Sequence, residues 1–184
     1  MVVAYLRNLS RGASLLDLGC GNGTMLASFR DRGWQLTGAD VSSSGIQLAR
    51  RTWPGIHFER LDATGDVSML GLGQYDAIIS TEVIEHVFLP HEFVKNCYRL
   101  LKPGGILILS TPYHGYLKNL VIALTGGFDR HWNPLFDYGH IKFWSVSTLS
   151  HLLYEAGFDN LEWRGAGRMP HLWKSFVIKA TKPS

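Results

Sequence analysis

Short apolar runs alternate with helical segments along most of the chain. The runs have the length of strands and occupy residues 15–18, 34–39, 56–61, 75–80 and 106–110. Between them, residues 23–32, 43–51 and 90–101 have helical spacing or helix-capping residues. This alternation predicts an α/β protein with a doubly wound, mostly parallel sheet. The unbroken run at 106–110 favours a strand that is covered on both faces.

The C-terminal third departs from this alternation. Residues 148–156 are predicted to form the last helix, capped by Ser147 and ended by Gly157, and 158–164 and 173–180 predict an antiparallel strand pair. Residues 112–144 are too long for a plain connection and rich in glycine and aromatic residues, which predicts a lid or insertion over the site. We interpret residues 1–184 as a single domain.

Composition and charge argue against several classes of protein. The formal charge of +3 and the absence of a lysine or arginine run argue against a nucleic-acid partner. No apolar run approaches the ~20 residues that span a bilayer, and the first residues do not resemble a secretory signal peptide. Cys20 and Cys97 match no metal or disulfide spacing, so we expect a cytoplasmic protein. Residues 117–124 predict a short amphipathic helix, which packs on the lid or makes a peripheral membrane contact.

A glycine-rich turn follows the first predicted strand, in the stretch Leu-Leu-Asp-Leu-Gly-Cys-Gly-Asn-Gly at 15–23. Strand, glycine loop and helix open a nucleotide-binding α/β sheet. Thr24 stands where the dinucleotide motif G-x-G-x-x-G needs its third glycine. Asp17 at the end of the strand would repel a pyrophosphate and attract a cation. S-adenosylmethionine (SAM) has a sulfonium, an ammonium and an adenosine but no phosphate, so Asp17, Gly19, Cys20 and Gly21 are predicted to bind it.

Acidic residues also end the next two predicted strands. Asp40, followed by Val41, lies 21 residues after Gly19, near the offset of a ribose-binding carboxylate. Asp62, followed by Ala63, is placed to accept the adenine amino group. Thr81 follows the fourth strand. Because ligands bind beyond the carboxyl ends of such strands, we predict that these residues also contact the cofactor.

Three functions fit these patterns. The first is a SAM-dependent methyltransferase acting on a small molecule, at oxygen. The second is an NAD-dependent oxidoreductase or epimerase, against which Asp17 and the missing glycine at position 24 both argue. The third is a non-catalytic SAM-binding module.

The motifs resemble those of class I SAM-dependent methyltransferases. Residues 15–23 are similar to that family's first motif, Asp40 and Asp62 to its second and third, 75–87 to its fourth and 100–105 to the motif after it. The resemblance implies a Rossmann-like, seven-stranded sheet with the last strand antiparallel, and methyl transfer from SAM.

A narrower resemblance concerns residues 81–87, Thr-Glu-Val-Ile-Glu-His-Val. They are similar to the O-methyltransferases of ubiquinone biosynthesis. The resemblance implies a divalent metal such as Mg²⁺ near the acceptor, held by Glu82, Glu85 and His86, which we expect on one helical face. Many related chains use such a Glu-His pair for local hydrogen bonds instead.

Methyl transfer to oxygen needs a base within reach of the acceptor. Histidine titrates near neutral pH, and we favour His86 on the sheet and His140 in the insertion as catalytic candidates. Aromatic residues between 128 and 144 either wall an acceptor or pin the insertion to the sheet.

Overall fold

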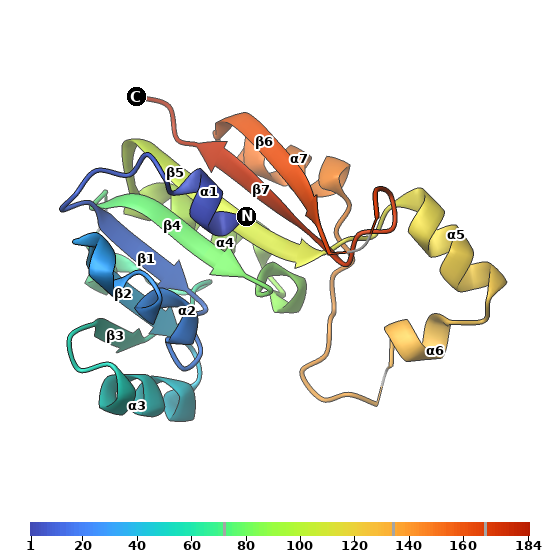
Figure 1. Ribbon diagram of the computed structural model, residues 1–184, viewed down its shortest axis with the longest axis horizontal. Helices are drawn as coiled ribbons and strands as arrows, with labels where there is room; N and C mark the ends of the chain where they lie inside the picture. Colours follow the sequence, from blue (N-terminus) through green and yellow to red (C-terminus); the bar gives the residue numbers. More distant parts are fainter. Residues whose placement is uncertain (72, 134, 168) are drawn as a thin grey trace.

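A twisted sheet of seven strands forms the centre of the computed structural model (Figure 1), which describes residues 1–71, 73–133, 135–167 and 169–184. The strand order is β3-β2-β1-β4-β5-β7-β6. β7 runs antiparallel to both β5 and β6, whereas β1 to β5 pair in parallel. This confirms the predicted fold class. The strands are β1 (Ser14–Leu18), β2 (Gln35–Asp40), β3 (His57–Arg60), β4 (Tyr75–Thr81), β5 (Leu101–Pro112), β6 (Asp159–Ala166) and β7 (Ser175–Thr181).

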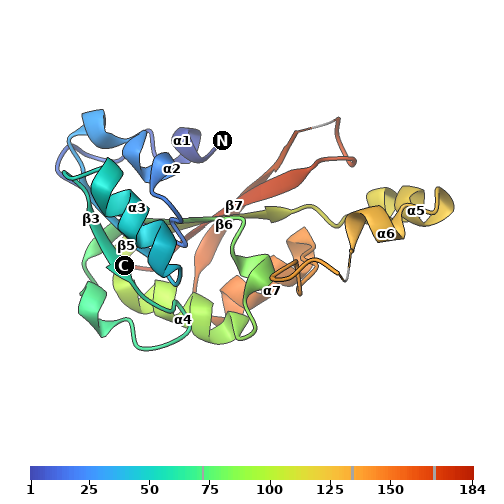
Figure 2. The same ribbon diagram turned by 90° about the horizontal axis from the view of Figure 1, so that it is seen from below.

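Helices cover both faces of the sheet. Figure 2 shows α1 (Val2–Tyr5), α2 (Thr24–Ala27) and α3 (Ser43–Thr52) on one side and α4 (Pro90–Leu100) and α7 (Val146–Glu155) on the other. Each side has its own hydrophobic core. Along β1, Leu15 faces the core beneath α2 and α3, and Leu16 faces the core beneath α4 and α7. Both side chains are fully buried. Burial on both faces explains why the central strands are apolar at successive positions.

Two helices differ in detail from the sequence-based expectation. The helix expected at 23–32 is the short α2 followed by a 3₁₀ turn, η1 (Arg30–Arg32), which ends at Gly33 with φ 71°. Helix α7 begins earlier than expected, and its N-cap is Ser145 rather than Ser147. Ser145 and Thr148 form a capping box, which satisfies two backbone N–H groups and therefore fixes the start of the helix.

The insertion, residues 112–144, projects from the sheet rather than lying over it. It holds α5 (Tyr116–Leu124), close to the predicted helix, and α6 (Phe128–His131), which extend beyond the end of β5 in Figures 1 and 2. Lys118 fixes the base of α5, because its Nζ donates to the carbonyl of Tyr113 at 2.7 Å. In the described parts of the chain, no helix is both long and apolar enough for a bilayer.

The returning segment of the insertion, residues 139–144, lies against the turn that follows β4. The amides of Ile141 and Lys142 both donate to the carbonyl of Glu85 at 2.9 Å. Trp144 Nε1 donates to the carbonyl of Ile84 at 3.2 Å. Through these contacts the returning segment lies beside the 3₁₀ turn η3 (Ile84–His86). Another 3₁₀ turn, η2 (Ser68–Leu70), precedes β4.

Candidate active site

The loop after β1 has a backbone that only glycine adopts without strain. Gly19 has φ 88°, and a Cβ there would collide with the side chain of Val83. At Gly23, with φ 74°, a Cβ would lie 2.6 Å from Phe58 Cζ. The loop is also tied to β2, because the amide of Gly19 donates to the carbonyl of Ala39 at 2.7 Å. The glycine pattern in the sequence therefore marks a tightly packed turn at the end of β1.

Asp40 joins the loops that follow β1 and β2. Its Oδ2 accepts from the amide of Gly21 and its Oδ1 from the amide of Ser42, both at 2.8 Å. The side chain is only partly buried and borders a cavity. From this one position, Asp40 can therefore both cap the loop and the helix and face a ligand.

The carboxyl ends of β1, β2, β3 and β4 border one cavity of about 470 Å³, which we call the strand-end cavity. Among the described residues that line it are three carboxylates, Asp40, Asp62 and Glu82, and neither a lysine nor an arginine. Of the predicted residues, it brings together Gly19, Asp40, Val41, Asp62, Ala63, Thr81, Glu82 and His86. The cavity is therefore negatively charged and suits a cation better than a phosphate.

Asp17 lies beneath this cavity and does not line it. Its side chain is 2% exposed, and its Oδ1 has no hydrogen-bond partner among the described residues. Burial, together with the nearby charge of Asp40, raises the pKa of Asp17 to about 7. A buried carboxyl oxygen without a donor is costly, so the site fits a positively charged group that approaches this strand end.

Cys20 and Gly21 also lie outside the lining of the strand-end cavity. Cys20 is buried, and its Sγ points toward Gly38, where a Cβ would lie 2.8 Å away. Burial and the charges of Asp17 and Asp40 raise the pKa of the Cys20 thiol to about 12. Its thiol is therefore not a nucleophile, and a role in binding falls to its backbone.

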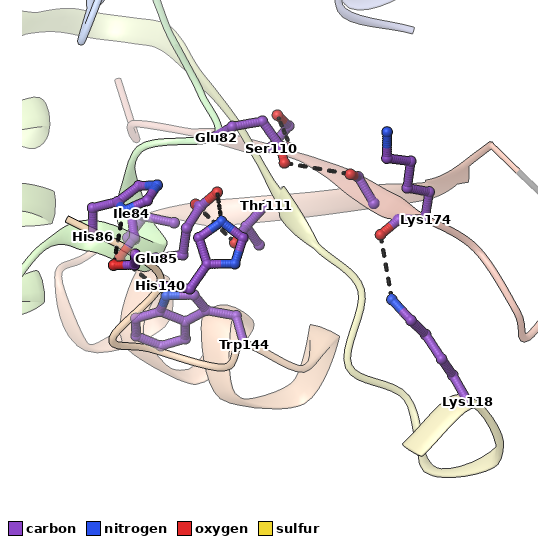
Figure 3. Close-up of polar contacts among 12 residues, drawn as sticks. Glu82, Ile84, Glu85, His86, Ser110, Thr111, Lys118, His140, Trp144 and Lys174 are labelled. Carbon is purple, nitrogen blue, oxygen red and sulfur yellow. Dashed lines mark hydrogen bonds and ion pairs between the residues drawn. The ribbon is translucent and has the colours of Figure 1, made fainter. Parts of the chain in front are cut away.

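Glu85 lies at the contact between the sheet and the returning segment (Figure 3). Its side chain is fully buried, and its Oε2 accepts from Thr111 Oγ1 at 3.0 Å. Its Oε1 has no hydrogen-bond partner in the described part of the chain and lies 3.9 Å from Nε2 of His140. Burial, opposed in part by hydrogen bonds, raises the pKa of Glu85 to about 7.

The two predicted histidines are neighbours although they are 54 positions apart. The rings of His86 and His140 meet edge to face, with centroids 4.9 Å apart. His86 Nδ1 and the carbonyl of Gly139 are at hydrogen-bond distance, 3.2 Å. Burial and the neighbouring His86 lower the pKa of His140. A neutral imidazole at this place can accept a proton.

Glu82 borders the strand-end cavity with His86, but the cluster of converging ligand atoms found among the described residues does not include it, contrary to the expected helical face. It precedes η3 with φ 56°, and its carboxylate accepts from Ser110 Oγ at 2.8 Å and from Ser175 Oγ at 3.4 Å (Figure 3). The ligand atoms that do converge belong to Glu85, His86 and His140 and lie within 4.8 Å of one another. The left-handed residue before the turn explains this, because it breaks the helical spacing.

A second hollow, the insertion cavity, lies between α6 and the returning segment and has a volume of about 420 Å³. Trp132 and Phe143 meet edge to face in its wall, with centroids 5.6 Å apart. His114 packs behind them, and burial lowers its pKa to about 4. Sequence reasoning missed Thr111 and Arg130, because neither belongs to a motif; only their places beside Glu85 and in this cavity single them out.

Comparison with known proteins finds methyltransferases. The model of a family described as "Methyltransferase domain" matches residues 2–162. The chain is 30% identical to a ubiquinone biosynthesis O-methyltransferase of Roseobacter denitrificans, over 95% of this chain and 75% of the relative. It is 29% identical to the enzyme of that name from Dinoroseobacter shibae, over 86% of this chain but only 64% of the relative's length.

A solved structure agrees in fold. Phosphoethanolamine N-methyltransferase 2 of Haemonchus contortus, in complex with S-adenosyl-L-methionine, has a TM-score of 0.75. The identity is 15%, over all of this chain and 52% of that one, so the likeness concerns the fold alone. With a family model that covers most of its length, the chain belongs to the methyltransferase domain family.

Proposed function

We propose that the protein transfers a methyl group from SAM to an oxygen atom of a small molecule. The observation that carries the proposal is the strand-end cavity, which has three carboxylates and no lysine or arginine among its described lining residues. This charge suits the sulfonium and ammonium groups of SAM and would repel a pyrophosphate. The NAD-dependent reading therefore loses its basis, and family membership supports methyl transfer.

SAM, when bound, supplies a methyl group on a sulfonium sulfur. In our proposal, Asp40 and Asp62 bind its polar adenosine groups, and Gly19 and Gly21 allow close approach of the loop backbone. Asp17, whose Oδ1 has no hydrogen-bond partner among the described residues, is protonated when the site is empty and would ionise as the cation approaches, because a nearby positive charge lowers the pKa of a carboxyl group. Val41, Ala63 and the backbone of Cys20 shape the walls, and Thr81 stands at the end of β4 beside Glu82. The protein thus contributes orientation and charge, which are the main needs of an in-line displacement.

The base that we propose is His140, assisted by His86. His86 lines the strand-end cavity, whereas His140 lines the insertion cavity, so the pair stands between the two. Glu85 lies behind His140, with Thr111 holding its other oxygen. An acceptor hydroxyl that reaches this pair can lose its proton to imidazole as its oxygen attacks.

A divalent metal is the alternative use of the same cluster. The two histidines and Glu85 offer one oxygen and two nitrogen atoms, whereas the set expected from the sequence offered two carboxylates and one imidazole. Imidazole suits zinc, iron and similar ions better than Mg²⁺. Glu85, His86 and His140 would hold such an ion, which would lower the pKa of a bound hydroxyl.

Calorimetric titration with SAM and S-adenosylhomocysteine tests the cofactor assignment. We expect both to bind, and NADH not to bind. Asp40→Ala should weaken binding roughly 10- to 100-fold, since it removes hydrogen bonds to a charged group. Asp31→Ala, at a carboxylate whose side chain is 90% exposed on η1, is the control. Equal effects of the two substitutions, or no binding of either ligand, would refute the proposal.

A methyl-release assay over phenols, catechols and sugars separates an enzyme from a non-catalytic SAM-binding module. His140→Gln should lower turnover roughly 100-fold while cofactor affinity stays unchanged. Adding EDTA distinguishes the base from the metal: loss of turnover that zinc or manganese restores would favour the metal.

Both cysteines are buried and unpaired, which supports the cytoplasmic location that we propose.

A further inference from the structure

Asn96 is a buried polar side chain on a helix face that is otherwise apolar. Helix α4 buries Phe93, Val94, Cys97 and Leu100 in the core, and Asn96, 2% exposed, is buried beside them. A buried amide costs free energy unless it is hydrogen-bonded, so an apolar residue would serve packing better here. The partners of Asn96 therefore indicate what the side chain does.

These partners lie in the loop that follows β3, residues 62–65, which we call the β3 loop. Asn96 Nδ2 donates to the carbonyl of Ala63 at 3.0 Å and to that of Gly65 at 2.9 Å. An amide nitrogen carries two hydrogens, so both of its donors are used on this one loop. The other end of the amide is fixed from α4, because its Oδ1 accepts from Arg99 Nη1 at 3.4 Å.

The β3 loop forms part of the wall of the strand-end cavity, through Asp62, Ala63 and Thr64. Within the loop, Asp62 Oδ1 accepts from the amide and from the hydroxyl of Thr64, both at 2.8 Å. No hydrogen bond within the described residues reaches Asp62 Oδ2. One oxygen of this carboxylate is thus held by the loop, and the other is available to a ligand.

The position of the β3 loop depends on Asn96. The amide of Gly65 closes the turn by donating to the carbonyl of Asp62 at 3.0 Å, but this bond is internal to the loop. In the part of the chain that the structure describes, the carbonyls of Ala63 and Gly65 accept from Asn96 alone. Hydrogen bonds weaken steeply when they are misaligned, so a loop released from α4 would present Asp62 poorly.

We propose that Asn96 is a positioning residue that gives the strand-end cavity a preference for adenine, by holding the β3 loop so that Asp62 presents Oδ2 to the amino group of the base. This inference rests on the proposed function for the identity of the ligand as SAM. It goes beyond that proposal in assigning base recognition to a side chain on α4 that does not line the cavity.

The test compares S-adenosylhomocysteine with S-inosylhomocysteine, whose base has a carbonyl oxygen in place of the adenine amino group. This oxygen cannot donate to Asp62, so the wild type should bind the adenosine compound about ten-fold or more tightly in calorimetry. Asn96→Ala leaves the loop without both donors, and the preference should fall below about three-fold. Asn96→Asp keeps the shape of the side chain but lacks the NH₂ group, and should have the same effect.

Cys97→Ala is the matched control, because Cys97 is the next residue of α4, is fully buried and packs in the core. It truncates a buried side chain as Asn96→Ala does, and it should keep the full preference for adenine. Hydrogen exchange provides a second readout, since the amides of Thr64 and Gly65 should exchange faster in Asn96→Ala but not in Cys97→Ala.

Equal affinity of the wild type for the two compounds would overturn the inference, and so would a preference that survives in a folded Asn96 variant. Loss of the fold in both Asn96 variants would also overturn it, because Asn96 would then act on stability alone. All of these outcomes leave the proposed function standing as long as S-adenosylhomocysteine binds to the wild type. A wild type that binds neither SAM nor S-adenosylhomocysteine would refute the proposed function itself.

Discussion

The glycine loop and the insertion approach the same end of the sheet but are held there differently. The loop is fixed by backbone hydrogen bonds to β2 and by Asp40, which accepts two backbone amides. The insertion is held mainly by side chains that pack on one another, such as Phe128 on Trp132 and Trp132 on Phe143. The strand-end cavity is therefore built by the sheet itself, whereas the insertion cavity belongs to a separate aromatic cluster joined to the sheet by the returning segment.

The difference in burial between the two regions should appear most strongly in a pair of phenylalanines. Phe58 is 2% exposed beneath the glycine loop, and Phe128 is 47% exposed on α6. Phe58→Ala should lower the free energy of unfolding by about 3–5 kcal/mol, because it leaves a cavity in the core. Phe128→Ala should cost less than about 1 kcal/mol. Urea denaturation measures both, and comparable losses would show that the insertion is integrated into the main core.

The conformation of the loop gives the next largest effect. Gly19→Ala adds a methyl group that collides with Val83, at a φ of 88° that disfavours alanine. It should destabilise the protein by roughly 2–4 kcal/mol, from strain and overpacking together. It should also weaken SAM binding in calorimetry. Gly55→Ala is the control, since a Cβ at Gly55 meets nothing within 4 Å. If Gly19→Ala and Gly55→Ala are equally stable, the loop is not as closely packed as described.

The buried carboxyl beneath the loop predicts a pH dependence. The pKa of Asp17 is raised to about 7 in the folded protein, so the folded state keeps a proton that the unfolded chain releases above about pH 4. Stability therefore falls as the pH rises from about 4 to 7. Between pH 5 and 7, the wild type should lose roughly 2–3 kcal/mol more than Asp17→Asn. Parallel stability curves for the two proteins would contradict a buried, protonated Asp17.

The start of α7 gives the smallest effect. Ser145→Ala removes a capping box and should cost about 1 kcal/mol. Ser147→Ala, at the position that the sequence favoured as the cap, should cost less than about 0.5 kcal/mol. Thermal denaturation of the two variants decides between the caps. The reverse order of their midpoints would restore the cap inferred from the sequence.

The sequence by itself determined the sheet and the acidic residues at the ends of its strands. Alternating apolar runs predicted the parallel strands, because a strand with both faces buried is apolar at every position. Gly19 and the acidic residues Asp40 and Asp62 could be placed at the carboxyl ends of strands, because connectivity in such a sheet puts these ends at one edge. These are local patterns within one strand-loop-helix unit, so they could be read without tertiary contacts.

Only the tertiary structure decided how the side chains around η3 and the insertion are arranged. It directed the carboxylate of Glu82 to Ser110 and Ser175, because a left-handed residue interrupts the expected helical face. It brought His140 to His86 and Arg130 to the aromatic cavity, although no motif connects them. It also directed α5 and α6 away from the sheet. These contacts join residues that are distant in the sequence, and their geometry depends on side-chain packing, which hydrophobic periodicity does not encode.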